Sequence, residues 1–83
     1  MANKFRVLRI NGVRKGKDFG VFRSEDVAGM ASPIEDGAAP CMLANCTADE
    51  ARRYVRELGR GATVESIRAR RQHYKNMQHS GMN

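Results

Sequence analysis

The chain has 83 residues, of which 41% are hydrophobic and 29% are charged. This composition excludes a largely disordered chain, and the length allows one small domain with a limited core. The net charge of +6 favours an anionic partner, which could be nucleic acid, an acidic protein surface or an anionic membrane surface.

The charges are sorted along the sequence. Residues 1–23 carry seven Lys and Arg against a single acid, and residues 51–83 carry eight against two. Between them, residues 24–50 contain six acids and no Lys or Arg. Two basic segments around an acidic one are more typical of a binding surface than of a catalytic pocket. The acidic segment either neutralises the basic segments or docks on a basic partner.

The sequence gives no sign of a membrane segment. The longest stretch without charge, residues 37–48, is too short to cross a bilayer. The first residues lack the apolar region of a signal peptide. We therefore expect no membrane partner and a cytoplasmic location, where Cys41 and Cys46 would remain thiols.

The first predicted element is an antiparallel β-hairpin with a basic tip. Residues Lys4–Ile10 alternate as a strand, with Phe5 and Val7 on one face. The dipeptide Asn11-Gly12 favours a hairpin turn, and Phe19–Arg23 is the returning strand.

The acidic segment predicts shorter elements. Ser24 is a suitable N-cap for a short helix that includes Val27, Met30 and Ala31 and that stops before Pro33. Residues 34–40 are interpreted as a loop, and Cys41–Asn45 as a third strand.

Thr47 and Glu50 form the pattern of a capping box and predict the start of a helix. Gly59 is expected to end it as the residue that follows the last helical turn. Arg52, Arg53 and Arg56 lie on the side opposite the apolar stripe. The stripe of this helix comprises Ala51, Tyr54, Val55 and Leu58.

Two structures remain open for the next segment. One is a second helix capped near Thr63, favoured by a composition rich in Arg, Ala and Gln. The other is a strand over Ala62–Arg68 that would close the sheet. The predicted stripe of the helix comprises Val64, Ile67, Arg71, Tyr74 and Gln78.

The predicted fold class is α+β. One domain over residues 1–77 would have an N-terminal antiparallel hairpin or three-stranded sheet, packed by the capped amphipathic helix and followed by a basic C-terminal helix. Residues 78–83 are expected to form a flexible tail.

The predicted partner-binding residues combine the hairpin tip with the basic faces of the last third. Arginine suits both phosphates and carboxylates because its planar fork can bind two oxygens at once. The competing interpretation is a solvated helix face. The predicted site consists of Arg14, Lys15, Lys17, Arg52, Arg53, Arg56, Arg68, Arg70, Arg71 and Tyr74.

Catalysis and metal binding are less favoured. The sequence has no Gly-rich phosphate loop and no nucleophile motif with a nearby histidine, so we expect no enzyme and no cofactor. Cys41, Cys46, His73 and His79 are zinc-ligand types, but the gap between the two pairs is much longer than in a zinc finger. Two buried thiols and two surface histidines are the preferred interpretation.

Two functions fit these features. The first is a small inhibitor or adaptor that occupies an acidic or nucleic-acid-binding surface of a larger protein machine. The second is a nucleic-acid-binding protein that contacts DNA or RNA phosphates. In size and in the lack of catalytic motifs the chain resembles the small accessory proteins that bacteriophages direct at host enzymes, including anti-CRISPR proteins and polymerase inhibitors. The resemblance implies the first function. From the size of the chain we expect a monomer or a homodimer.

Overall fold

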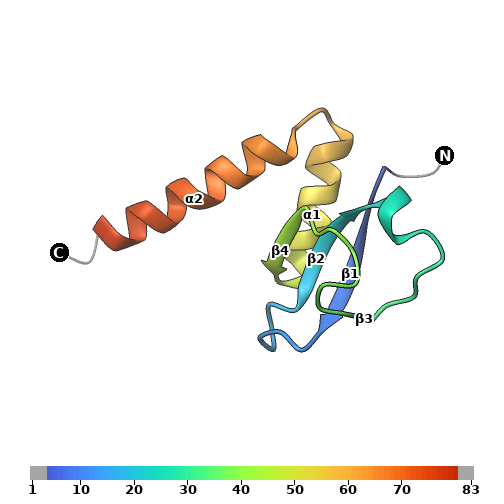
Figure 1. Cartoon of the computed structure of the whole chain (residues 1–83). Helices are drawn as coiled ribbons and strands as arrows, with labels where there is room; N and C mark the ends of the chain where they lie inside the picture. Colours follow the sequence, from blue (N-terminus) through green and yellow to red (C-terminus); the bar gives the residue numbers. More distant parts are fainter. Residues whose placement is uncertain (1–3, 81–83) are drawn as a thin grey trace.

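The computed structural model describes residues 4–80, with side chains through Lys75. It is an α+β domain in which helix α1 packs on one face of a four-stranded mixed sheet and helix α2 projects to one side (Figure 1). The elements are β1 (Phe5–Asn11), β2 (Phe19–Arg23), the 3₁₀-helix η1 (Ser24–Val27), β3 (Ile34–Glu35), β4 (Leu43–Cys46), α1 (Ala48–Gly59) and α2 (Val64–Ser80).

The predicted hairpin is confirmed. Strands β1 and β2 pair antiparallel from Phe5 opposite Arg23 to Arg9 opposite Phe19. The connection between them, residues 12–18, is longer than the tight turn that Asn11-Gly12 suggested. Asp18 explains this difference, because its backbone oxygen accepts from Ile10 N at 2.7 Å and its Oδ2 accepts from Arg9 Nε at 2.7 Å.

The Asp18 carboxyl is buried, and the hydrogen bond from Arg9 holds its pKa below the usual value. Asp18 thus fixes the last residue of the connection. The basic tip residues Arg14, Lys15 and Lys17 are exposed.

The sheet differs from the predicted three-stranded antiparallel arrangement. Its order is β3-β1-β2-β4, and the two-residue strand β3 pairs in parallel with Ile10 and Asn11 in a segment that was expected to be a loop. The buried side chain of Ile34 joins the cluster that contains Ile10, so packing holds this short strand. Strand β4 begins two residues later than expected and extends to Cys46.

The predicted helix after Ser24 is wrong in kind and length. Residues Ser24–Val27 form one 3₁₀ turn, the N-cap is Arg23, and no side chain caps it. Val27 is fully buried, and Gly29 has a positive φ of 81°. The chain therefore changes direction at Gly29, two residues after the buried Val27.

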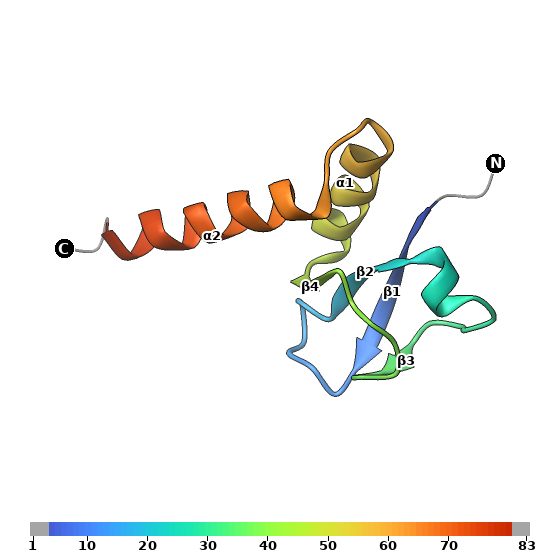
Figure 2. The same cartoon turned by 45° about the horizontal axis from the view of Figure 1, so that its top comes forward.

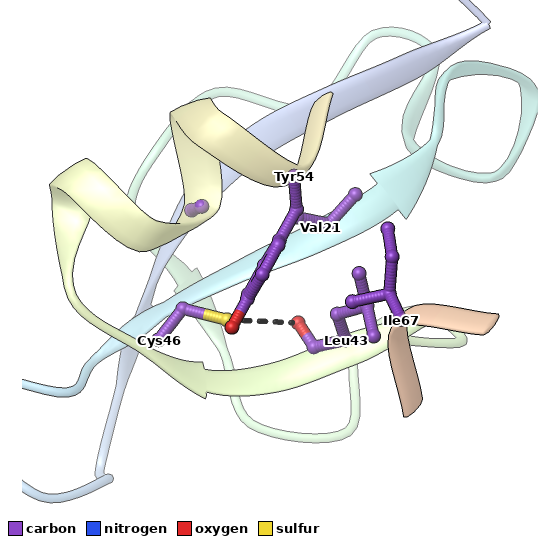
Figure 3. Packing of buried hydrophobic residues seen from close by; sticks show 6 residues of the cluster. Val21, Leu43, Cys46, Tyr54 and Ile67 are labelled. Atoms are coloured by element: carbon purple, nitrogen blue, oxygen red, sulfur yellow. Dashed lines mark hydrogen bonds between the residues drawn. The ribbon is translucent and has the colours of Figure 1, made fainter. Parts of the chain in front are cut away.

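The sheet buries residues on both faces. The first cluster lies between the sheet and the helices (Figure 3) and contains Val21, Leu43, Cys46, Ala51, Tyr54 and Ile67. The second lies on the opposite face and contains Leu8, Ile10, Phe22, Val27 and Ile34. Phe5 and Val7 pack against the first cluster, so the alternation predicted for β1 is confirmed.

Helix α1 has the predicted capping box. Glu50 N donates to Thr47 Oγ1 at 3.1 Å, and Thr47 N donates to Glu50 Oε1 at 2.9 Å. The predicted end is shifted, because Gly59 is still helical and Arg60 is the C-cap.

Gly61, with φ 107°, supplies the left-handed residue that ends the helix. Its N–H donates to Leu58 O at 3.3 Å, and Ala62 N donates to Glu57 O at 3.0 Å. This is the bonding pattern of a Schellman motif. The chain is thereby reversed into α2.

The segment after Thr63 is a helix rather than a strand. Thr63 and Ser66 cap its start reciprocally, with Ser66 N donating to Thr63 Oγ1 at 3.0 Å and Thr63 N donating to Ser66 Oγ at 3.2 Å. Ile67 is buried, whereas Tyr74 is 64% exposed. The predicted stripe therefore packs only at the start of α2, and the rest of the helix projects from the body (Figure 2).

The predicted flexible tail is only partly covered by the structure. Residues 78–80 continue the backbone of α2, and residues 81–83 lie outside the described residues. Across residues 4–80, no helix is both long and apolar enough to cross a bilayer.

Candidate functional site

A basic groove lies between the first half of α2, strand β4 and the connection from β1 to β2. Its volume is about 1110 Å³, and residues 41–45 line it together with the basic side chains. One carboxylate, Glu50, is among the lining residues. The basic side chains that line it are Arg14, Lys17, Arg53, Arg68, Arg70, Arg71 and Lys75, and Tyr74 lies beside them.

The structure divides the predicted site between two grooves. Seven of its members line the basic groove: Arg14, Lys17, Arg53, Arg68, Arg70, Arg71 and Tyr74. Arg52 and Arg56 instead line a second groove, which Arg53 also reaches, between α1 and β1. Lys15 is exposed at the hairpin tip and lines neither groove.

Arg68 and Arg71 dock α2 on the edge strand β4. Arg68 donates from Nε and Nη2 to Met42 O at 3.0 and 2.8 Å. Arg71 Nη2 donates to Ala44 O at 2.8 Å and to Asn45 O at 3.2 Å. All three acceptors are neutral carbonyls, so these bonds fix the positions of both guanidinium groups without neutralising their charges.

Glu57 compensates part of the remaining charge. Arg70 Nη2 lies 2.7 Å from Glu57 Oε1, and Arg53 Nε lies 4.0 Å from its Oε2. The guanidinium carbons of Arg53 and Arg71 lie 5.6 and 5.7 Å from the centre of the Tyr54 ring, within the range of cation–π attraction. Arg53 and Arg70 are therefore held mainly by contacts within the protein.

Arg14, Lys17 and Lys75 are the remaining basic side chains of the groove. All three are exposed, and none forms an ion pair with any residue in the described part of the chain. Long side chains of this kind can move toward an anion without breaking a contact in the protein.

Glu50 is the carboxylate that offsets part of the positive charge of the groove. The N–H of Thr47 donates to it in the capping box and lowers its pKa, and the charges of Lys17 and Arg71 act in the same direction. Glu50 is thus ionised at neutral pH, and its Oε1 already accepts the hydrogen bond from Thr47 N at the N-terminus of α1.

The cysteines provide no activated nucleophile. Burial raises the pKa of the Cys41 thiol at the groove and raises that of Cys46 to about 11. The Cys46 Sγ lies 3.8 Å from Leu43 O (Figure 3). Both groups are therefore thiols at neutral pH, and the reactive form of cysteine is the thiolate.

The four residues of zinc-ligand type, which were not favoured as a metal site, are not brought together as far as the structure describes them. Within residues 4–75, whose side chains are described, no three His, Cys, Asp or Glu residues form a group that would hold a metal. Cys46 is buried and His73 is exposed on α2. The side chain of His79 lies outside the described residues.

The sequence analysis missed the acceptors of α2. The carbonyls of Met42, Ala44 and Asn45 carry no signal in the sequence, because any residue has one. Lys75 lies one turn beyond Arg71 and was left out of the predicted site. Helical spacing from Arg68 and Arg71 was the signal that would have included it.

Comparison of the chain with protein-family models, with curated proteins and with solved structures finds no match.

Proposed function

We propose that this protein is a non-enzymatic nucleic-acid-binding protein that contacts phosphates through the basic groove. The observation that carries the proposal is a concave surface lined by seven basic side chains and one carboxylate. The basic side chains come from the hairpin connection, α1 and α2. A phosphate backbone supplies closely spaced negative charge. When a protein binds nucleic acid without sequence specificity, contacts between basic side chains and phosphates supply most of the affinity.

The arrangement combines cations fixed by hydrogen bonds with exposed cations that form no ion pair with the described residues. Arg68 and Arg71 are held by carbonyls of β4, so little conformational entropy is lost when they meet a phosphate. Each also keeps N–H groups that the docking bonds do not use, because a guanidinium has five. Lys17 and Lys75 can then adjust to the spacing of neighbouring phosphates.

Contacts with bases have little support on this surface. Tyr74 is the one exposed large hydrophobic residue in the described part of the chain. Proteins that bind single strands by stacking use several aromatic side chains. We therefore propose binding that depends on phosphates and salt and only weakly on sequence.

A second candidate function is the inhibitor or adaptor that binds an acidic protein surface. Tyr74, 64% exposed, favours it, because it lies beside arginines and Tyr and Arg are the residue types enriched at interface hot spots. We place this function second, since stable protein interfaces have an apolar core and Tyr74 alone offers little of it.

A salt titration tests the first proposal. A mixed-sequence DNA duplex labelled with fluorescein is titrated with the protein at several salt concentrations, and anisotropy reports the affinity. The logarithm of the association constant is expected to fall linearly with the logarithm of salt, with a slope of about −3 to −5 for four or five phosphate contacts. Binding that is absent at low salt, or affinity that does not change with salt, would contradict the proposal.

A further inference from the structure

The outer edge of β1 is open over its first residues. Strand β3 pairs with β1 only at Ile10 and Asn11, and Figure 2 shows it beside the last part of β1. On the other edge, β1 pairs with β2 throughout. In the described part of the chain, no strand pairs with Phe5 or Val7 on the outer side.

The hydrogen-bond register shows which residues face this open edge. Ile10 N donates to Asp18 O at 2.7 Å, and Ser24 N donates to Lys4 O at 2.9 Å. Even-numbered residues of β1 therefore direct their backbone groups toward β2, and alternate residues direct theirs outward. Arg9 confirms this, since its N–H donates outward to Ser32 Oγ at 2.9 Å.

Phe5 and Val7 thus present their N–H and C=O groups as an unfilled ladder. A groove of about 750 Å³ lies along this part of β1. Phe5, Val7 and Val55 give it an apolar floor of half-buried side chains. Arg52 and Arg56 of α1 form its basic rim.

We propose that this edge binds an extended acidic peptide segment of a partner protein by β-strand addition. The backbone of the peptide would pair with Phe5 and Val7, as in other complexes in which a strand joins an exposed sheet edge. Apolar side chains of the peptide would cover Val7 and Val55, and its carboxylates would meet Arg52 and Arg56. Asp49 is the acid among the lining residues, and it lies 2.9 Å from Arg52. Arg56 forms no ion pair with the described residues.

Charge complementarity selects this occupant over a second copy of the chain. If two copies paired through β1, each would bring its own arginine rim to the other, and like charges would face one another across the new ladder. The surface is also separate from the basic groove, because Arg53 is the one lining residue that they share. The inference therefore does not depend on nucleic-acid binding.

Amide hydrogen exchange of the free protein tests the open edge. We expect the amides of Phe5 and Val7 to exchange at least tenfold faster than those of Arg6 and Leu8, because only Arg6 and Leu8 direct their N–H groups toward β2. Equal protection of all four amides would overturn the proposal. Protection of Phe5 and Val7 that grows with protein concentration would show a second copy at this edge and would overturn it as well.

Peptide binding tests the occupant. The probe is a short synthetic peptide with the repeat Val-Thr-Glu-Thr, in which valine and glutamate both lie on the face that would meet α1, and NMR follows the protein amides during its titration. We expect shifts at Phe5, Val7 and Val55 and slower exchange of the Phe5 and Val7 amides. Two control peptides, one N-methylated at alternate residues and one with lysine in place of glutamate, are expected to bind at least tenfold more weakly. Equal binding of the N-methylated peptide would exclude a backbone ladder.

The rim is tested by R56E, with K15E as its control. Both variants reverse one exposed charge, but Lys15 lies at the hairpin tip, outside this groove. R56E is expected to weaken binding of the acidic peptide about five- to twentyfold, because it replaces an attraction with a repulsion. K15E should change the affinity less than twofold. Equal effects of the two variants would overturn the assignment of the rim.

Discussion

Replacement of Arg14, Lys17 and Lys75 together by alanine is expected to weaken DNA duplex binding by about 10- to 500-fold at 0.1 M salt. These side chains are the cations of the basic groove that form no ion pair with the described residues, and each is proposed to contact a phosphate. The slope of the logarithm of affinity against that of salt should become shallower by about one unit per lost contact. The measurement is the anisotropy titration, with circular dichroism to confirm that the variant is folded.

A second triple variant provides the matched control. Lys4, Arg23 and Arg60 are exposed, line neither groove and form no ion pair with the described residues. Their replacement by alanine removes the same net charge. This control is expected to lose less than about threefold in affinity, because distant exposed charges are largely screened at this salt concentration. An equal loss in both variants would mean that total charge, rather than the groove, drives binding.

Ile67→Ala is expected to lower the free energy of unfolding by about 2–4 kcal/mol. Ile67 is 1% exposed and packs in the cluster that contains Leu43 and Tyr54. Within residues 64–75 it is the one buried side chain of α2, so a cavity at this position removes most of the apolar contact that holds the helix on the body. Urea unfolding followed by far-ultraviolet circular dichroism measures the change.

The same substitution should also affect binding, because the groove exists only while α2 is docked. Glu65→Ala is the matched control. It lies in the first turn of the same helix and is exposed, so its removal should cost less than about 1 kcal/mol, mainly from the helix dipole. If Ile67→Ala unfolded no more easily than Glu65→Ala, the position of α2 would not depend on this contact.

Local patterns predicted much of the fold. Alternation in β1 assigned Phe5 and Val7 to one face of the strand, and in the structure both pack against the first cluster. The capping box at Thr47 and Glu50 is present in full. These signals are reliable because the interacting residues are within a few positions of one another.

The errors in the prediction involve interactions between distant residues. Strand β3 has two residues, too few to show alternation, and it is held by pairing with β1 and by the burial of Ile34. The turn at Ser24 was predicted as a helix because the sequence does not show that Val27 is buried against Phe22 and Leu8. The end of α1 was assigned to Gly59, although Gly61 is the glycine with positive φ.

The same contrast between local patterns and interactions of distant residues applies to the candidate site. Residue type and helical spacing correctly indicated exposed arginines on α1, but they did not show that Arg52 and Arg56 belong to a different groove from Arg68 and Arg71. The separation follows from the docking of α2 on β4, which depends on carbonyls 26 or 27 residues away along the chain. Spacing patterns contain no information on such acceptors.

The most direct test of the proposed function is an NMR titration of the labelled protein with the mixed-sequence DNA duplex at low salt. We predict that the largest amide shifts occur along the basic groove, at residues 14–17, 42–45 and 68–75, and that Phe5, Val7 and Val55 change little. Shifts spread evenly over every exposed lysine and arginine, or concentrated in the groove beside β1, would contradict the assignment of nucleic-acid binding to the basic groove.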